Sequence, residues 1–257
     1  MDYIYVMIDI FALAQNPLAF QKPRTITSAY IDVSGKMGIA QTVLMVQDNF
    51  TENFGKIKQD NFFVKEKGGY WAISKARFKF FQRPYWREKV LTTSYPTCDS
   101  LIRVNENTAI TTTEGEPIVF AVQETCCLDL NRHRPMKLST VEFQVDASLS
   151  PLLEEPFTKF DVDDSEFAEV YQQTVLPQHI DMSHHVNNIE YVKLSLNVFS
   201  IDDLELCLPS DMELHFLGES HVGQVLKVLR SDKKGATYMR ITDESGRIVF
   251  EMKIKFK

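Results

Sequence analysis

Two stretches of the chain place apolar residues at helical spacing directly after a short polar turn. The apolar positions are Ile39, Val43 and Val46 in the first stretch and Ile189, Val192, Leu196 and Phe199 in the second. Intervals of three or four residues put such positions on one face of a helix. Because a short apolar segment precedes each turn, both stretches predict a strand, a turn and then a buried helix.

Downstream of each predicted helix the apolar positions alternate with polar ones, which is typical of half-buried β-strands. The alternation covers residues 70–81 after the first helix and residues 212–229 after the second. Residues 124–130 and 236–257 predict further strands, the latter interrupted by a turn at residues 244–246.

The two halves of the chain are similar to each other. Residues 30–50 (YIDVSGKMGIAQTVLMVQDNF) align without a gap with residues 179–199 (HIDMSHHVNNIEYVKLSLNVF), an offset of 179 − 30 = 149. In the later strands Phe81 aligns with Phe216, an offset of 216 − 81 = 135, so the first copy carries 149 − 135 = 14 extra residues. Such self-similarity predicts one structural unit present twice.

A helix followed by several antiparallel strands, present twice, predicts an α+β fold. In each half a central helix is expected to be wrapped by a curved antiparallel sheet, with the two sheets side by side. We expect an N-terminal extension at residues 1–23, a first unit at 24–146, a linker at 147–167 and a second unit at 168–257. The linker is acidic, contains two prolines and lacks periodicity.

Composition restricts the class of protein. Of the 257 residues 44% are apolar and 25% charged, as in a globular protein, and the net charge of −7 argues against a nucleic-acid binder. Asp2 and Asp9 interrupt the apolar N-terminus, so we expect neither a signal peptide nor an integral membrane span. No metal-binding spacing is present among the cysteines, which we expect to be reduced in a cytoplasmic protein: Cys98, Cys126, Cys127 and Cys207.

Polar chemistry is concentrated at the entry to the second helix, in residues 180–192 (IDMSHHVNNIEYV). An acid, a hydroxyl, two histidines and two asparagines fall within eight consecutive positions. The first copy has Gly35, Lys36 and Met37 opposite His184, His185 and Val186, and Pro84 and Tyr85 opposite Glu219 and Ser220. We therefore expect the second unit to be catalytic and the first to hold the substrate.

Free backbone N–H groups at a helix entry can hydrogen-bond a developing oxyanion. Asp181, Ser183 and His185 beside that entry, with Glu219 from the adjacent strand, could orient and deprotonate a water without a metal. The inventory favours hydrolysis of an ester or thioester. Two alternatives remain. In the first, Asp181 and Ser183 are only turn and capping residues. In the second, His179, His184 and His185 form a metal site, although their spacing matches no standard ligand pattern.

The segment DMSHHVNNIEY, residues 181–191, resembles the pattern Asp-x-Asn-x-His-Val-Asn-Asn-x-x-Tyr of the acyl-acyl carrier protein (acyl-ACP) thioesterases, which are double hot-dog proteins. FLGES, residues 216–220, is similar to the family's Tyr-Arg-Arg-Glu-Cys, and residues 68–86 resemble its first hot-dog unit. The resemblance extends from about residue 24 to the C-terminus.

The resemblance implies that Asp181, His185 and Glu219 are catalytic. Ser183 stands where the family has asparagine, and Ser220 where many members have cysteine. No cofactor and no metal are implied. The expected reaction is hydrolysis of fatty acyl-ACP to free fatty acid in fatty acid biosynthesis. An acyl-CoA thioesterase and a catalytically weakened acyl-binding protein remain alternatives.

The resemblance also implies where the partners bind. Acyl carrier protein is the partner that it implies. Separately, alternation along one predicted strand puts Lys75, Arg77 and Lys79 on one face, which could dock an acidic carrier protein or the phosphates of coenzyme A, or could simply be a solvated face. The acyl chain is expected in the first unit, which is rich in aromatics: Phe62, Phe63, Tyr70, Trp71 and Phe78. Two fused units supply the paired sheets of a hot-dog dimer, so a monomer or a homodimer is expected.

Overall fold

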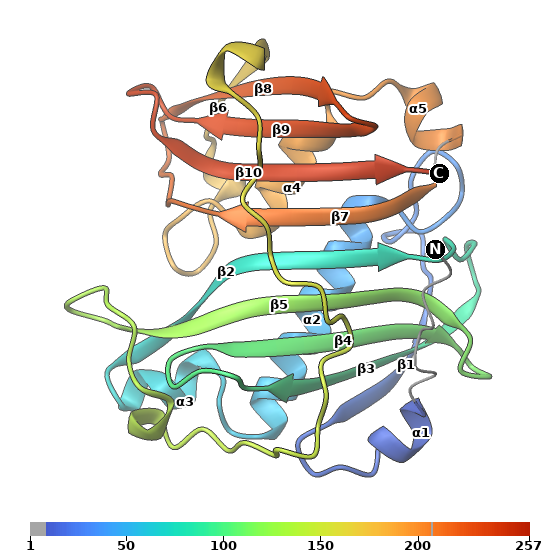
Figure 1. Ribbon diagram of the computed structural model, residues 1–257, viewed down its shortest axis with the longest axis vertical. Helices are drawn as coiled ribbons and strands as arrows, with labels where there is room; N and C mark the ends of the chain where they lie inside the picture. The colour runs from blue at the N-terminus through green and yellow to red at the C-terminus, as the bar shows by residue number, and fades with distance from the viewer. Residues whose placement is uncertain (1–8, 207) are drawn as a thin grey trace.

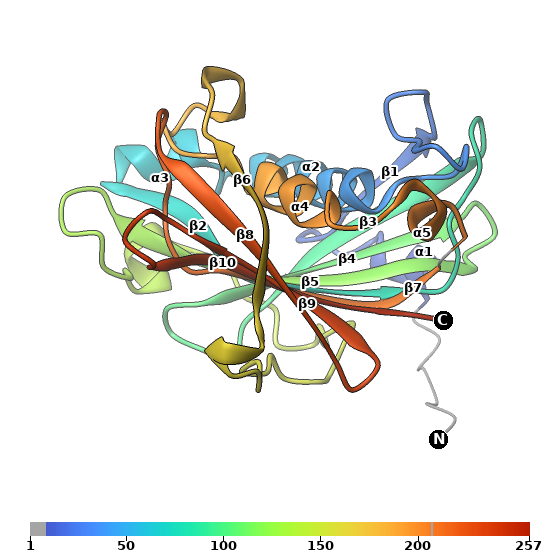
Figure 2. The ribbon, with the colours of Figure 1, turned by 90° about the horizontal axis from the view of Figure 1, so that it is seen from above.

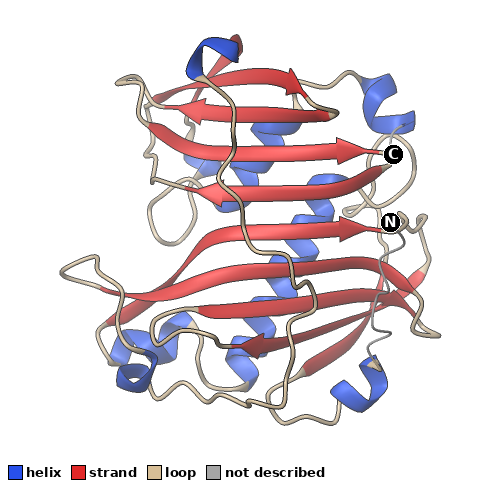
Figure 3. Cartoon of the chain, viewed as in Figure 1, coloured by secondary structure: helices blue, strands red, loops and turns tan. Residues whose placement is uncertain are grey.

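The computed structural model describes residues 9–206 and 208–257, and these form one ten-stranded antiparallel sheet with its two central helices on one face (Figure 1, Figure 3). Cys207 and residues 1–8, which make up most of the apolar N-terminal segment, lie outside the described residues. No helix within the described residues is long and apolar enough to cross a membrane.

The described elements divide between the two halves of the chain. The first half contains α1 Ile10–Leu13, β1 Phe20–Thr25, α2 Ile39–Lys56, α3 Asn61–Glu66, β2 Gly69–Phe80, β3 Lys89–Thr97, β4 Val104–Thr112, β5 Pro117–Asp129 and the 3₁₀ helix η1 Leu138–Val141. The second contains η2 Asp164–Glu166, β6 Ala168–Thr174, η3 Pro177–His179, α4 Asn188–Leu196, α5 Ile201–Leu206, β7 Pro209–Phe216, β8 Val225–Lys233, β9 Ala236–Thr242 and β10 Ile248–Phe256.

The strand order is β1-β3-β4-β5-β2-β7-β10-β9-β8-β6. The two units therefore meet at β2 and β7, which pair in antiparallel register from Lys75 opposite His215 to Lys79 opposite Asp211. Helices α2 and α4 lie side by side on the concave face of this sheet (Figure 2). Their apolar positions, such as Val46 and Val192, share one buried core with both halves of the sheet. The predicted α+β double hot-dog is confirmed.

Two local details differ from the expectation. Helix α4 ends at Leu196, so Phe199 lies beyond it, although its ring still packs against the core. The expected strand before each helix is reduced to a single β-bridge, from Ile180 to Val186 in the second unit. Each helix is preceded by a tight loop that folds back on itself, and this leaves too few residues for a regular strand.

The repeat has a different register in the later strands from the one expected. The N–H of Arg87 donates to the carbonyl of Ile26, and the N–H of Gly223 donates to the carbonyl of Val175. The two acceptors, Ile26 and Val175, are equivalent, because their offset of 175 − 26 = 149 equals that of the helices. The two donors, Arg87 and Gly223, are therefore equivalent as well, with an offset of 223 − 87 = 136 rather than 135. Both residues have positive φ, 73° and 88°. Matching the phenylalanine side chains misplaced the alignment by one residue, because backbone hydrogen bonds set the register.

The correction changes which residues of the first unit correspond to the predicted site. Arg83 and Pro84, rather than Pro84 and Tyr85, stand opposite Glu219 and Ser220. The carbonyl of Pro84 accepts from Met37 N–H at 2.8 Å, as the carbonyl of Ser220 accepts from Val186 N–H at 2.9 Å, which confirms the equivalence.

The segment between the two units, residues 147–167, crosses the face of the sheet opposite the helices (Figure 2). Arg77 on β2 donates to the carbonyls of Glu155 and Pro156, both at 2.7 Å. Glu213 on β7 accepts from the N–H of Thr158 at 2.8 Å. The segment is therefore fastened to the two central strands, where the two units join.

Candidate active site

The loop before α4 is a tight turn built around Asp181. The N–H of Asp181 donates to the carbonyl of His185 at 3.0 Å, and the N–H of His184 donates back to the carbonyl of Asp181 at 3.1 Å. One carboxylate oxygen of Asp181, Oδ1, accepts from the N–H of Ser183 at 2.8 Å. Asp181 thus has the turn-forming role expected of a short acid, and its second oxygen makes no hydrogen bond to any described residue.

This turn is fixed against the end of β7. The N–H of Val186 donates to the carbonyl of Ser220 at 2.9 Å, which places His185 beside Glu219. His185 Nε2 lies 3.3 Å from Glu219 Oε2, and the ring of His221 packs edge-on against that of His185 with centroids 5.0 Å apart. Arg247, on the turn between β9 and β10, donates to the Glu219 carbonyl at 3.1 Å. A carboxylate and a histidine are thereby placed side by side.

The beginning of α4 lies next to this pair. Asn187 is the N-cap: its side chain accepts from the N–H of Ile189 at 3.1 Å and its carbonyl from the N–H of Glu190 at 2.9 Å. The N–H of Asn188 has no hydrogen-bond partner within the described part of the chain. A free N–H at the positive end of a helix is suited to a negatively charged oxygen.

Two hydroxyls are buried behind the pair. Ser220 is fully buried and Tyr191 is 2% exposed, and neither hydroxyl makes a hydrogen bond of ordinary geometry to a described residue. Burial raises the pKa of Tyr191, although the nearby Ser220 acts in the opposite direction. Ser220 therefore lies in the wall behind the site, and it does not line the cavity.

A cavity of about 410 Å³ brings the two units together at this point. The second unit contributes Asp181, Ser183, His185, Glu219 and the ring of Tyr191. The first unit contributes the apolar side of the cavity, mainly from α2, β2 and β5: Phe50, Trp71, Ile73, Cys126 and Leu128. Four of the five predicted site residues thus line one cavity, and most of its apolar wall comes from the other half of the chain.

Of the aromatic residues expected to surround an acyl chain, Tyr70 and Trp71 line the cavity. Phe62 is 73% exposed, and Phe78 is buried in the main core. Phe50 was not predicted, although it follows Val43 and Val46 at helical spacing and could have been found by extending that face.

Residues 163–257 match the family model for the acyl-ACP thioesterase C-terminal domain. The second unit of this chain is therefore similar in sequence to the C-terminal domain of the acyl-ACP thioesterases. A thioester hydrolase is the enzyme class that this match supports.

Solved structures show the same fold at low sequence identity. An acyl-ACP thioesterase from Bacteroides thetaiotaomicron is 17% identical, with a TM-score of 0.84 and coverage of 93% of this chain and 98% of that one. The 12:0-ACP thioesterase from Umbellularia californica is 14% identical, with a TM-score of 0.81 and coverage of 94% and 98%. No curated protein matches the chain in sequence.

In the first unit an ion pair occupies the positions that correspond to Asp181 and Glu219. Arg83, which corresponds to Glu219, is 8% exposed and forms a salt bridge with Asp32, the counterpart of Asp181. Arg83 also donates to the carbonyls of Met37 at 2.8 Å and Leu204 at 3.1 Å. A guanidinium cation cannot accept a proton from water, and this one already donates hydrogen bonds to three partners. The first unit therefore has no base at this position.

The three histidines of the alternative metal site do not come together in the structure. Within residues 9–206 and 208–257, no three side chains of the metal-binding types converge. His179 accepts from the N–H of Leu176 at 3.0 Å, which turns its ring toward its own 3₁₀ helix rather than toward His184 and His185.

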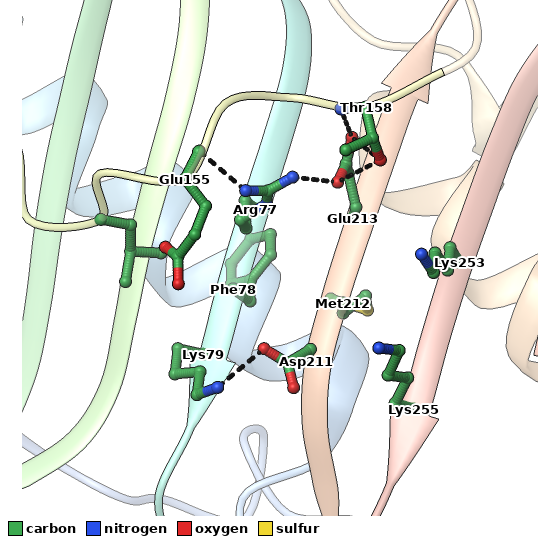
Figure 4. Close-up of a pocket in the computed structure, with 11 residues that line it drawn as sticks. Arg77, Phe78, Lys79, Glu155, Thr158, Asp211, Met212, Glu213, Lys253 and Lys255 are labelled. Atoms are coloured by element: carbon green, nitrogen blue, oxygen red, sulfur yellow. Dashed lines mark hydrogen bonds and ion pairs between the residues drawn. The ribbon is translucent and has the colours of Figure 1, made fainter. Parts of the chain in front are cut away.

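The basic residues of β2 that were expected to dock a partner do not lie at the cavity, and the positive charge of two of them is neutralised by acids. Arg77 forms a salt bridge with Glu213, and Lys79 lies 3.0 Å from Asp211 (Figure 4). The groove that they line faces the linker, on the side of the sheet opposite α2 and α4 (Figure 2). Alternation along the strand predicted correctly that these cations share a face. Acids on β7 pair with two of them, and the sequence did not reveal that β7 is the neighbouring strand.

Proposed function

We propose that the thioesterase hydrolyses fatty acyl-ACP to free fatty acid and the carrier-protein thiol, a step of fatty acid biosynthesis. The observation that carries the proposal is the cavity shared by the two units. Its apolar wall suits an acyl chain, and its polar end holds an acid, a histidine and a helix N-terminus. The acyl-ACP thioesterases of the same fold support the carrier protein as leaving group.

In the proposed reaction a water between Glu219 and the substrate attacks the thioester carbonyl carbon. Glu219 accepts the proton of that water, and His185, 3.3 Å from Glu219, orients the carboxylate and exchanges the proton. The carbon–sulfur bond then breaks, and the thiolate leaves and recovers a proton from the His185–Glu219 pair. No covalent intermediate is required, because a thiolate is a good leaving group.

The carbonyl oxygen gains negative charge in this step. The free N–H of Asn188 at the start of α4 is placed to hydrogen-bond it, and the helix dipole adds to the stabilisation. Loss of one such donor typically costs about 10²-fold or more in rate. The free oxygen of Asp181 lies at the same end of the cavity, where it can hold the attacking water or His185.

The acyl chain would follow the apolar wall into the first unit, past Trp71, Ile73 and Leu128. Removal of this chain from water contributes about 0.8 kcal/mol for each buried methylene. The first unit therefore acts as the substrate holder, while the reacting carbon stays at the second unit.

The test is thiol release from a panel of acyl-ACP and acyl-CoA thioesters with wild type, Glu219→Gln and Glu244→Gln. Glutamine keeps the shape of Glu219 but accepts no proton, so we expect kcat to fall about 10²-fold or more. Glu244, exposed on the nearby β9–β10 turn, is the matched control and should leave kcat unchanged. An active Glu219→Gln enzyme would contradict the mechanism, and faster turnover of acyl-CoA than acyl-ACP would favour the coenzyme A alternative.

One observation favours a second candidate, an acyl-binding protein with weakened catalysis. The hydroxyl of Ser34 in the first unit donates to Asp32 at 2.6 Å, whereas the hydroxyl of Ser183 makes no corresponding bond to a described residue. Serine also lacks the planar amide of the family's asparagine. Acyl binding without turnover in wild type, together with turnover gained by Ser183→Asn in the same assay, would establish this candidate.

A further inference from the structure

The loop between β5 and η1 carries an unusual concentration of positive charge for a chain with a net charge of −7. Residues 131–137 (NRHRPMK) contain Arg132, Arg134 and Lys137, together with His133, and no acid. All three permanent cations are exposed, and none forms a salt bridge with another described residue. We refer to residues 131–137 as the basic loop.

The basic loop is held in one conformation. At its base, Oδ1 of Asp129 accepts from the N–H groups of Asn131 and Arg132 at 2.9 and 2.8 Å, and Asp129 N–H donates to the carbonyl of Arg134 at 2.9 Å. These backbone hydrogen bonds lower the pKa of Asp129, so it stays ionised. At the other end, Met136 N–H donates to the carbonyl of Cys127 at 2.8 Å. The cations are thus presented on a preformed turn.

The basic loop lies at the edge of the molecule that carries the catalytic cavity. It continues directly from β5, whose Cys126 and Leu128 line that cavity. Tyr70, another lining residue, lies with its hydroxyl 3.1 Å from Nδ1 of His133. In Figure 1 the ends of β5 and β7 and the loop before α4 all point to the same side. An acidic partner on the basic loop would therefore be next to the cavity entrance.

We propose that the basic loop docks the carrier protein through the acidic surface around its pantetheine arm. This inference rests on the proposed function, because hydrolysis of acyl-ACP requires a surface that binds the carrier protein. Charge complementarity carries it: exposed, unpaired cations on an otherwise acidic molecule raise the rate of encounter with an acidic partner and orient it. Arg132 and Arg134 also suit the phosphate of the arm, because a guanidinium binds phosphate through two parallel hydrogen bonds.

The test compares wild type with Arg132→Glu/Arg134→Glu and with Lys253→Glu/Lys255→Glu. The second pair makes the same charge change on β10, in the groove of Figure 4 on the opposite side of the sheet. Substrates are one acyl group on carrier protein, on coenzyme A and on N-acetylcysteamine, which carries no phosphate. Binding of fluorescently labelled holo carrier protein is measured in parallel by anisotropy.

In the loop variant we expect the KM for acyl-ACP and the Kd for holo carrier protein to rise about tenfold or more, with a weaker salt dependence. Hydrolysis of the N-acetylcysteamine thioester should stay unchanged, and the β10 variant should behave as wild type. An unchanged Kd and KM for the carrier protein would overturn the proposal. So would an equal loss on all three thioesters, or a loss confined to acyl-CoA.

The two proposals can fail separately. Wild type without activity on any thioester would refute the proposed function, and the anisotropy measurement alone would then decide whether the basic loop binds the carrier protein. Turnover in wild type with carrier-protein binding insensitive to Arg132 and Arg134 would refute only the docking surface.

Discussion

His184 adopts a backbone conformation that the first unit leaves to glycine. Its φ is 64°, and Gly35 at the equivalent position has φ 70°. This left-handed region of backbone conformation costs a residue with a Cβ about 1 kcal/mol, whereas glycine adopts it without strain. The strained residue sits directly before His185, in the turn that sets His185 against Glu219. The second unit thus keeps a costly side chain where the first unit has the residue that the turn favours.

The reciprocal substitutions His184→Gly and Gly35→His test this strain. We expect His184→Gly to raise the free energy of unfolding by up to about 1 kcal/mol, because the left-handed strain is relieved. Gly35→His should lower it by a similar amount, and there is open space around Gly35, so the effect is one of backbone strain alone. Chemical denaturation of both variants measures it, and a change of the same sign in both would contradict the explanation.

At the scale of elements, Glu213 joins β7, β2 and the linker. Burial by itself raises the pKa of Glu213, but hydrogen bonds from His215, from Arg77 and from the N–H of Thr158 outweigh it and lower the pKa to about 2. His215 also stacks on Phe160 of the linker with centroids 4.4 Å apart. One ionised carboxylate therefore holds together the strands at which the two units meet.

Because the pKa of Glu213 is lower in the folded chain, its contribution to stability is complete above the unfolded value near 4.5 and is lost as the pH falls toward 2. The contribution is on the order of 3 kcal/mol. Glu213→Gln should lower the stability at pH 7 and flatten its dependence on pH between 5 and 2. Urea denaturation at several pH values measures this. Glu155→Gln, at an exposed position of the linker, is the control, and an unchanged pH profile in Glu213→Gln would contradict the assignment.

At the scale of the whole molecule, the two units share one sheet and one core. Strands β2 and β7 pair directly, and the main core contains Val46 and Ile110 from the first unit with Val192 and Met239 from the second. Separation of the units would expose both the strand edges and this core. The cavity depends on the same contact between the units, because its ionisable side chains and most of its apolar wall come from different halves.

We therefore expect the chain to unfold in a single cooperative transition. Calorimetry should give equal van't Hoff and calorimetric enthalpies, and circular dichroism and tryptophan fluorescence should report the same midpoint. Both tryptophans, Trp71 and Trp86, belong to the first unit, so an independently unfolding unit would separate the two midpoints. Two transitions would show that the units are stable alone.

The sequence by itself determined the repeated unit, the two central helices and the cluster at the start of the second helix. These are local properties: Val43 and Val46 recur at helical spacing, and Asp181, Ser183 and His185 lie within one turn of chain. Comparison of the two copies also singled out Glu219, which is more than thirty residues away in the chain. Glu219 was expected on a strand beside the helix entry, and in the structure its Oε2 lies 3.3 Å from His185 Nε2.

Only the tertiary structure decided which strands are neighbours, and several properties follow from that. The pairing of β2 with β7 neutralises Arg77 and Lys79, and backbone hydrogen bonds show that Arg83, not Pro84, corresponds to Glu219. The apolar wall of the cavity likewise needs Leu128 of one unit beside His185 of the other. Spacing along a chain reports which side chains share a face, but register and pairing between distant strands arise only when the sheet forms.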